Sequence, residues 1–171
     1  MKTNFERGQL NAQDDLNANF KEIETGLALQ TTIVEGRPLT GAGTSETVLP
    51  FKEGSEKSTH PSIPPFFTVG GDGNLLCLKA GTYLFESANF VQPSVEFNGY
   101  FYLNLKINGS RPVNPRIGGL GANTVKNRND FFGRVIATVP ENATISVVTE
   151  TNASVSFTGF GVVVLTITPV F

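Results

Sequence analysis

The stretch GYFYLNLKING, residues 99–109, decides the fold class of this chain. Its apolar and polar residues alternate, so an extended strand here has one apolar and one polar face. The apolar face is formed by Phe101, Leu103, Leu105 and Ile107. This two-residue period predicts a half-buried β-strand. The dipeptide at 108–109, Asn then Gly, predicts a tight hairpin turn, because both residues tolerate positive φ angles.

Strand candidates of the same kind lie on both sides of this stretch, separated by turns rich in Gly, Asn and Pro. They cover residues 47–51, 66–69, 74–78, 82–91, 131–139, 144–150 and 155–168. About eight strands at this spacing predict an antiparallel two-sheet jelly roll or sandwich. We therefore expect residues 47–171 to form an all-β, jelly-roll head domain with the apolar face of 101–107 in its core. Glycines inside the strand candidates predict bulges or close backbone approaches: Gly133, Gly159 and Gly161.

The only helical pattern lies before these strands, in residues 10–29. Asn11 is placed to cap a helix N-terminus, and an apolar stripe follows with spacings of four, three and four residues. The stripe is Leu16, Phe20, Ile23 and Leu27. A helix this short must bury its stripe, either on its own domain or against copies of itself or a partner. The Gly-, Thr- and Pro-containing stretch that follows favours attachment or oligomerisation by residues 1–30, with 31–46 as a linker that holds at most one short strand.

The composition suits a scaffold better than a catalyst. The 171 residues include 14 Phe and 18 Gly but one His, one Cys and no Trp, and only 16% are charged. His60 has no second ligand nearby, and Cys77 reads as a small buried apolar residue. Spacing supports neither a nucleophile–base set nor paired carboxylates in the β region. We expect no enzyme activity, no cofactor and no metal, and the net charge of −2 argues against nucleic-acid binding.

Targeting signals are also missing from the sequence. The N-terminus has no apolar signal-peptide core. No apolar run approaches the roughly 20 residues of a membrane-spanning helix. The expectation is therefore synthesis in a cytoplasm, without standard secretion and without membrane insertion.

One stretch is basic in an otherwise acidic chain. Five basic residues stand against Asp130 alone: Arg111, Arg116, Lys126, Arg128 and Arg134. Residues 110–130 are rich in Pro, Gly and Asn, which predicts one long loop able to hold an anionic polymer. The candidate receptor-binding residues are Arg111, Arg116, Asn123, Lys126, Asn127 and Arg128. The alternatives are a solvated loop, or arginines paired with carboxylates of a neighbouring subunit; a site on the Tyr100/Tyr102 face or in the 52–65 loop is the fallback.

Two segments resemble a known class of heads. The stretch FTV at 67–69, GNL at 73–75 and KAGTYLF at 79–85 resembles the "F-x-V … A-G-x-Y-x-F" pattern of complement-globular-head and tumour-necrosis-factor-like trimers. The closing SFTGF at 156–160 resembles the final strand of that class. The resemblance covers roughly 47–171 and implies a homotrimeric jelly roll.

A third segment, FERGQLNAQDDLNANF at 5–20, resembles the opening of tailed-bacteriophage fibre and baseplate proteins. In those proteins it precedes an attachment helix. The two resemblances together imply a virion appendage made in the bacterial cytoplasm, gripped by other virion proteins through its N-terminal segment. They also imply a head that binds host surface polysaccharide or teichoic acid. A structural fibre or decoration protein without a receptor is the alternative.

Overall fold

The computed structural model describes residues 30–170 apart from 43, 61, 97, 122–125 and 153–155, together with Asn17, which is helical and exposed. The predicted N-terminal helix, with its stripe of Leu16, Phe20, Ile23 and Leu27, otherwise lies outside the described residues. Within the described part of the chain, no helix is long and apolar enough to cross a membrane.

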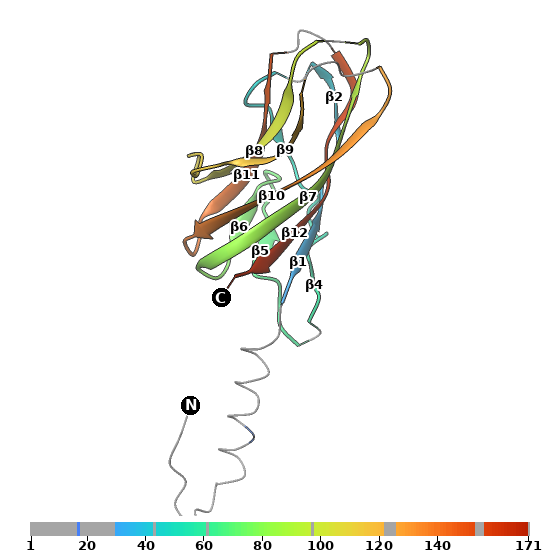
Figure 1. Cartoon of the computed structure of the whole chain (residues 1–171). Helices are drawn as coiled ribbons and strands as arrows, with labels where there is room; N and C mark the ends of the chain where they lie inside the picture. Colours follow the sequence, from blue (N-terminus) through green and yellow to red (C-terminus); the bar gives the residue numbers. More distant parts are fainter. Residues whose placement is uncertain are drawn as a thin grey trace, which may run out of the picture.

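The described residues form two antiparallel β-sheets that pack face to face (Figure 1). The first, called the β7 sheet, has the order β10 (Asn129–Val139), β7 (Gly81–Pro93), β12 (Ser156–Pro169), β1 (Thr32–Glu35) and β4 (Lys57–Ser58), with β2 (Leu39–Ala42) also on β12. The second, called the β8 sheet, has the order β5 (Phe67–Val69), β6 (Leu75–Cys77), β11 (Thr144–Thr151), β8 (Phe101–Ile107) and β9 (Arg116–Leu120), with β3 (Val48–Leu49) also on β11. The predicted all-β, two-sheet jelly roll is confirmed.

The core lies between the sheets and is rich in aromatic rings, as the 14 Phe suggest. Phe101, Leu103 and Leu105 are fully buried, and Ile107 is half-buried against the same cluster. The Phe101 and Phe157 rings meet edge to face at 5.2 Å between centroids. Each such buried side chain stabilises the fold by about 1.5–3 kcal/mol. The predicted burial of Cys77 is also confirmed.

The predicted linker over 31–46 is wrong, because this stretch supplies β1 and β2 to the β7 sheet. Val34 is fully buried, and the β1 ladder pairs Thr32 with Ile167 of β12. Between the two strands, a Cβ added to Gly36 would lie 1.9 Å from the Val162 carbonyl oxygen, so only glycine fits there. These strands are short and interrupted by Gly and Pro, and their stability comes from pairing with residues more than a hundred positions away.

The predicted long loop over 110–130 is also interrupted by a strand. β9 pairs with β8 in antiparallel register, from Phe101 opposite Leu120 to Asn104 opposite Arg116. The local sequence, Arg-Ile-Gly-Gly-Leu after a proline, carries a turn signal rather than a strand signal. Because β9 runs along the sheet for roughly 13 Å, it separates the residues before it from those after it.

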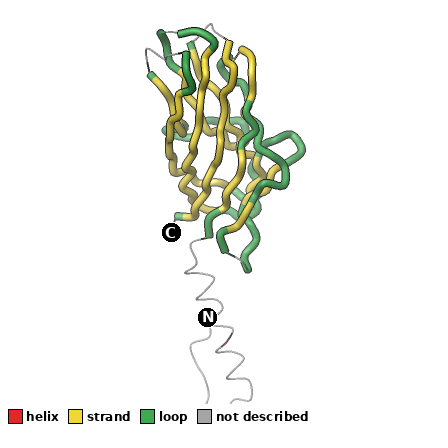
Figure 2. Tube along the Cα trace, turned by 90° about the vertical axis from the view of Figure 1, so that its right-hand side faces the viewer, coloured by secondary structure: helices red, strands yellow, loops and turns green. Residues whose placement is uncertain are grey.

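The sandwich has two distinct ends. Thr32 pairs with Ile167, and the amide of Val170 donates to the Thr82 carbonyl, so both ends of the described chain lie at one end, the near end. Asn129 pairs with Val91, which places the β9–β10 connection at the opposite, far end. Figures 1 and 2 show the strands running lengthwise between these two ends.

Candidate functional site

The outer strands of the two sheets, β9 and β10, touch at a glycine and then diverge. A Cβ added to Gly133 would lie 2.0 Å from the carbonyl oxygen of Ile117, so the two backbones are in direct contact there. The same carbonyl accepts a 2.6 Å hydrogen bond from the buried Ser87 hydroxyl. The expected close backbone approach at Gly133 is confirmed. Toward the near end the strands separate and leave a groove.

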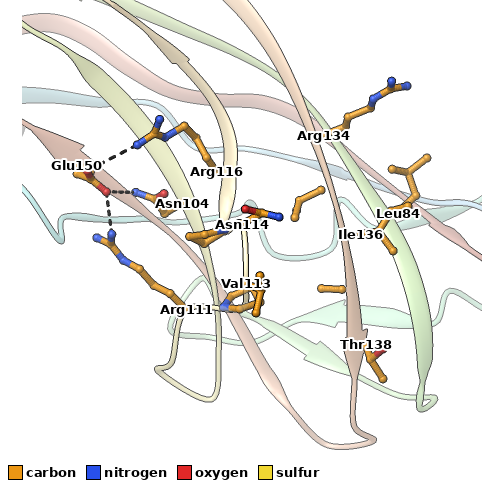
Figure 3. A pocket seen from close by; sticks show the side chains of 14 residues that line it. Leu84, Asn104, Arg111, Val113, Asn114, Arg116, Arg134, Ile136, Thr138 and Glu150 are labelled. Atoms are coloured by element: carbon orange, nitrogen blue, oxygen red, sulfur yellow. Dashed lines mark hydrogen bonds and ion pairs between the residues drawn. The ribbon is translucent and has the colours of Figure 1, made fainter.

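This groove has a volume of about 1210 Å³ and runs between the 111–116 segment and β10 (Figure 3). One wall holds Arg111 through Arg116, with Asn104 and Glu150 behind them. The other wall holds five consecutive residues of β10, from Arg134 to Thr138, and Leu84 of β7. The groove therefore combines basic, amide and apolar side chains from one strand, β10, and from the loop that leads into β9.

An ionic network fixes the first wall to the outer face of the β8 sheet. Arg111 makes ion pairs with Glu46 at 2.5 Å and with Glu150 at 2.7 Å. Glu150 also accepts a 2.8 Å hydrogen bond from the Asn104 amide, which is only 1% exposed. Figure 3 shows Arg111, Asn104 and Arg116 converging on the Glu150 carboxylate.

Glu46 is the second carboxylate of this network. It receives Lys106 as well as Arg111. Hydrogen bonds from Lys106, and then from Arg111, hold the pKa of the Glu46 carboxyl below its ordinary value. The charge of Arg111 is therefore largely neutralised by Glu46 and Glu150 of the same chain.

Arg116 is held differently, by an aromatic ring. Its guanidinium carbon lies 3.6 Å from the centroid of Tyr102, a cation–π contact, while Glu150 is 3.9 Å away. Tyr102 in turn stacks on Tyr100 at 4.8 Å and lies against Gly119, where an added Cβ would be 2.1 Å from the ring. The Tyr100/Tyr102 face is thus largely covered by its own neighbours.

The β10 wall is more open. The side chains of Arg134 and Ile136 lie on the outer face of the strand, and Ile136 is 61% exposed. Within the described part of the chain Arg134 has no ion pair, although Glu86 stands opposite it in the β7–β10 register. The Arg134 charge is therefore available to a ligand.

The remaining predicted site residues lie at the far end. Lys126, Asn127 and Arg128 are exposed just before β10. Arg128 makes a 2.8 Å ion pair with Asp130, and its guanidinium carbon lies 4.4 Å from the Phe90 ring centroid. Asn123 lies outside the described residues.

The structure therefore divides the predicted receptor-binding residues between two places. Arg111 and Arg116 line the groove, whereas Lys126, Asn127 and Arg128 form a far-end patch. Glu150 could not be recognised from the sequence, because its contacts to Arg111 and Asn104 span 39 and 46 positions. Arg134 is one of the five basic residues noted in the sequence, but its position beside the groove follows only from the pairing of β10 with β7.

The outer face of the β7 sheet carries a second hollow, of about 450 Å³. It lies between Ala88, Gly133 and Val164, and Phe132 stands beside it with 78% of its surface exposed. A large exposed aromatic residue next to a shallow apolar hollow is unusual on a surface that faces only water. This face has the character of a contact surface.

Among the described residues there is no group of three His, Cys, Asp or Glu placed to hold a metal ion. The Nδ1 atom of His60 accepts a 3.2 Å hydrogen bond from the Ser62 amide, a loop-shaping contact. The Gly70–Asn74 turn behaves likewise: the Asp72 carboxylate accepts bonds from the backbone and side chain of Asn74.

Comparison with solved structures identifies the fold. The chain superposes on the structure of Eiger TNF from S. frugiperda with a TM-score of 0.53 at 9% identity, covering 84% of this chain and 94% of that one. A crystal structure of murine APRIL gives a TM-score of 0.50 at 12% identity, covering 82% and 99%. The fold is TNF-like. No protein-family model and no curated protein matches the sequence. At such low sequence identity, the similarity to these structures concerns the fold and nothing more.

Proposed function

We propose that this protein is a non-enzymatic bacteriophage virion appendage. In this proposal a homotrimeric TNF-like head adheres to a glycan or teichoic acid on the host surface. Residues 1–30 attach the head to other virion proteins. The N-terminal resemblance to fibre and baseplate proteins supports the virion role, and the head-like fold supports the adhesive one.

The observation that carries this proposal is the two-ended layout of the sandwich. The chain enters the head at the near end, where Thr31 bonds to both Thr59 and Thr168. A particle that holds residues 1–30 would therefore present the far end outward. The far-end patch of Lys126, Asn127 and Arg128 lies there, on connections between rigid strands, where binding residues usually occur.

The hollow beside Phe132 supports the assembly part of the proposal. Phe132 and the hollow at Ala88 and Val164 form one patch on the outer face of the β7 sheet, and in this proposal the copies of a trimer bury the patch against one another. In a trimer the far-end patch occurs three times, so weak single sites combine through avidity.

The test is adsorption of the purified full chain to a panel of bacterial cells and to cell walls with and without their teichoic acid. We expect salt-sensitive binding, because exposed charge pairs are screened within about 8–10 Å at physiological ionic strength. The pair Lys126→Ala and Arg128→Ala should lower adsorption while the trimer persists. Arg37→Ala, an exposed arginine outside the far-end patch, is the matched control.

The results separate the alternatives. A stable trimer that adsorbs to no cell or wall would support the structural fibre or decoration protein instead. Release of reducing sugar from wall polymer would overturn the non-enzymatic assignment. A monomer at micromolar concentration, measured by light scattering on the full chain, would overturn the trimer.

A further inference from the structure

The groove is bordered by the edge of β10 rather than by one face of it. Side chains of a strand point alternately to opposite faces, so five consecutive residues border one groove only along the strand's edge. Residues Arg134 to Thr138 do so. Among the described strands, β10 is also the last of its sheet and pairs only with β7. Its outer edge is therefore open along the groove.

The open edge carries unpaired backbone groups. In an antiparallel pair, every second residue directs its N–H and C=O toward the partner strand, and the residues between direct theirs away. No described backbone or side-chain group outside β7 bonds to the backbone of Arg134 to Thr138. Proteins usually cover or blunt such edges. Here β9 covers the edge only as far as Gly133 and then turns away.

We propose that this half of the β10 edge binds an extended acidic peptide by strand addition. The peptide lies in the groove as a further strand of the β7 sheet and fills the gap toward the 111–116 segment. Its backbone pairs with β10, and its side chains alternate between the groove walls. This binding is separate from adhesion at the far end.

The size of the groove fits a chain-like ligand. Pockets for small molecules typically measure about 300–1,000 Å³, and this one is larger. It is also elongated along a strand. A single sugar or phosphate would fill little of it.

The residues that line the groove favour a negatively charged peptide. Three arginines line the groove against one carboxylate, Glu150. Arg111 is held by Glu46 and Glu150, and Arg116 packs on Tyr102 at 3.9 Å from Glu150, so Arg134 is the arginine of the groove without an ion pair among the described residues. Two apolar side chains, Val113 at 87% and Ile136 at 61% exposure, offer contact for apolar residues between the acidic ones. A backbone edge with apolar contacts favours an acidic peptide over an anionic polysaccharide.

The test titrates the full chain with a fluorescein-labelled peptide of alternating Glu and Val, followed by fluorescence anisotropy at low salt. We expect saturable binding and slower hydrogen exchange of the 134–138 amides. The same peptide N-methylated at every residue, which has no backbone N–H donor in either register, should bind at least about tenfold more weakly, a difference of about 1.4 kcal/mol. A peptide with Lys in place of Glu should not bind.

Charge reversal locates the site. Arg116→Glu with Arg134→Glu should weaken the peptide by at least about tenfold, whereas Lys57→Glu, the same reversal at the opposite edge of the β7 sheet, should leave it unchanged. Equal binding of the N-methylated peptide would overturn strand addition and show that the groove recognises the peptide by its charge alone. Edge amides already protected in the free protein would overturn it too, since a second copy would then cover the edge.

Discussion

The outer faces of the two sheets differ in whether their polar groups have partners and whether their apolar side chains are covered. On the β8 sheet, Glu150 and Glu46 gather Arg111, Lys106 and Asn104 into one network, and Tyr102 is covered by its neighbours. On the β7 sheet, Phe132 and Ile136 are exposed and Arg134 has no ion pair among the described residues. One face completes its contacts within the chain, and the other leaves them open.

We infer from this difference that partners contact the outer face of the β7 sheet. A charged network that satisfies itself contributes stability and leaves little for a partner. An apolar face beside an open strand edge gains stability only when something covers it. Substitutions of outer-face side chains should therefore alter folding on the β8 sheet and association on the β7 sheet.

The largest effect is expected from truncation, since β1 and β2 belong to the β7 sheet. A fragment of residues 47–171 loses both strands and the buried Val34, so β12 has no partner on one side. We expect no cooperative thermal transition for it by circular dichroism, whereas residues 30–171 should melt cooperatively. A cooperative transition in the shorter fragment would show that the two strands are accessory.

The next effect concerns the proposed trimer. In the proposed trimer, Phe132→Asp places a charge in the patch buried between copies and should cost about 2 kcal/mol or more per contact, enough to give monomers at micromolar concentration. Light scattering measures this. Val113→Asp, at a residue 87% exposed on the groove loop, is the matched control and should stay trimeric. A trimeric Phe132→Asp variant would place the interface elsewhere.

A smaller effect is expected within the network of the β8 sheet. Glu150→Ala leaves the buried Asn104 amide and the Arg111 guanidinium short of a partner, which should lower the free energy of unfolding by about 1–3 kcal/mol. Chemical denaturation measures it. Glu86→Ala, on the outer face of the β7 sheet, should change stability by no more than about 0.5 kcal/mol. Equal losses of unfolding free energy in the two variants would show that the two outer faces do not differ in this way.

The smallest expected effect is a change in how the stability of the fold depends on pH. The pKa of Glu46 is lowered in the folded protein, so its ionised form stabilises the fold above the ordinary pKa of 4.5. That contribution is lost as the pH falls through the lowered folded pKa. Glu46→Gln should therefore lose less stability than the wild type on acidification below about pH 4.5, measured by melting temperature. Glu53→Gln, an exposed glutamate, should follow the wild-type profile.

The sequence was a good guide wherever a local pattern sufficed. Alternation predicted β8 and its buried residues, and the Asn108 and Gly109 turn has the expected positive φ angles of 49° and 77°. Gly159, one of the predicted bulge positions, lies at a register shift of β12. In each case neighbouring residues determine the conformation.

The sequence failed where pairing across the molecule decides the structure. β1 is stabilised by β12, and β9 is a strand only because β8 lies beside it. The groove could not be predicted either, since its walls come from residues 111–116 and 134–138, which the contact at Gly133 brings together. Candidate residues were recognised by type, but β9 places them in two separate sites.

The ladder between β1 and β12 has a mechanical consequence. Gln30 at the near end and the far-end patch lie at opposite ends of the lengthwise strands, so a pull between them runs along the strand axes. The hydrogen bonds between antiparallel strands are perpendicular to that direction. They are loaded together in shear, instead of one after another as in peeling. A head tethered at one end and gripped at the other would resist tension best in this orientation.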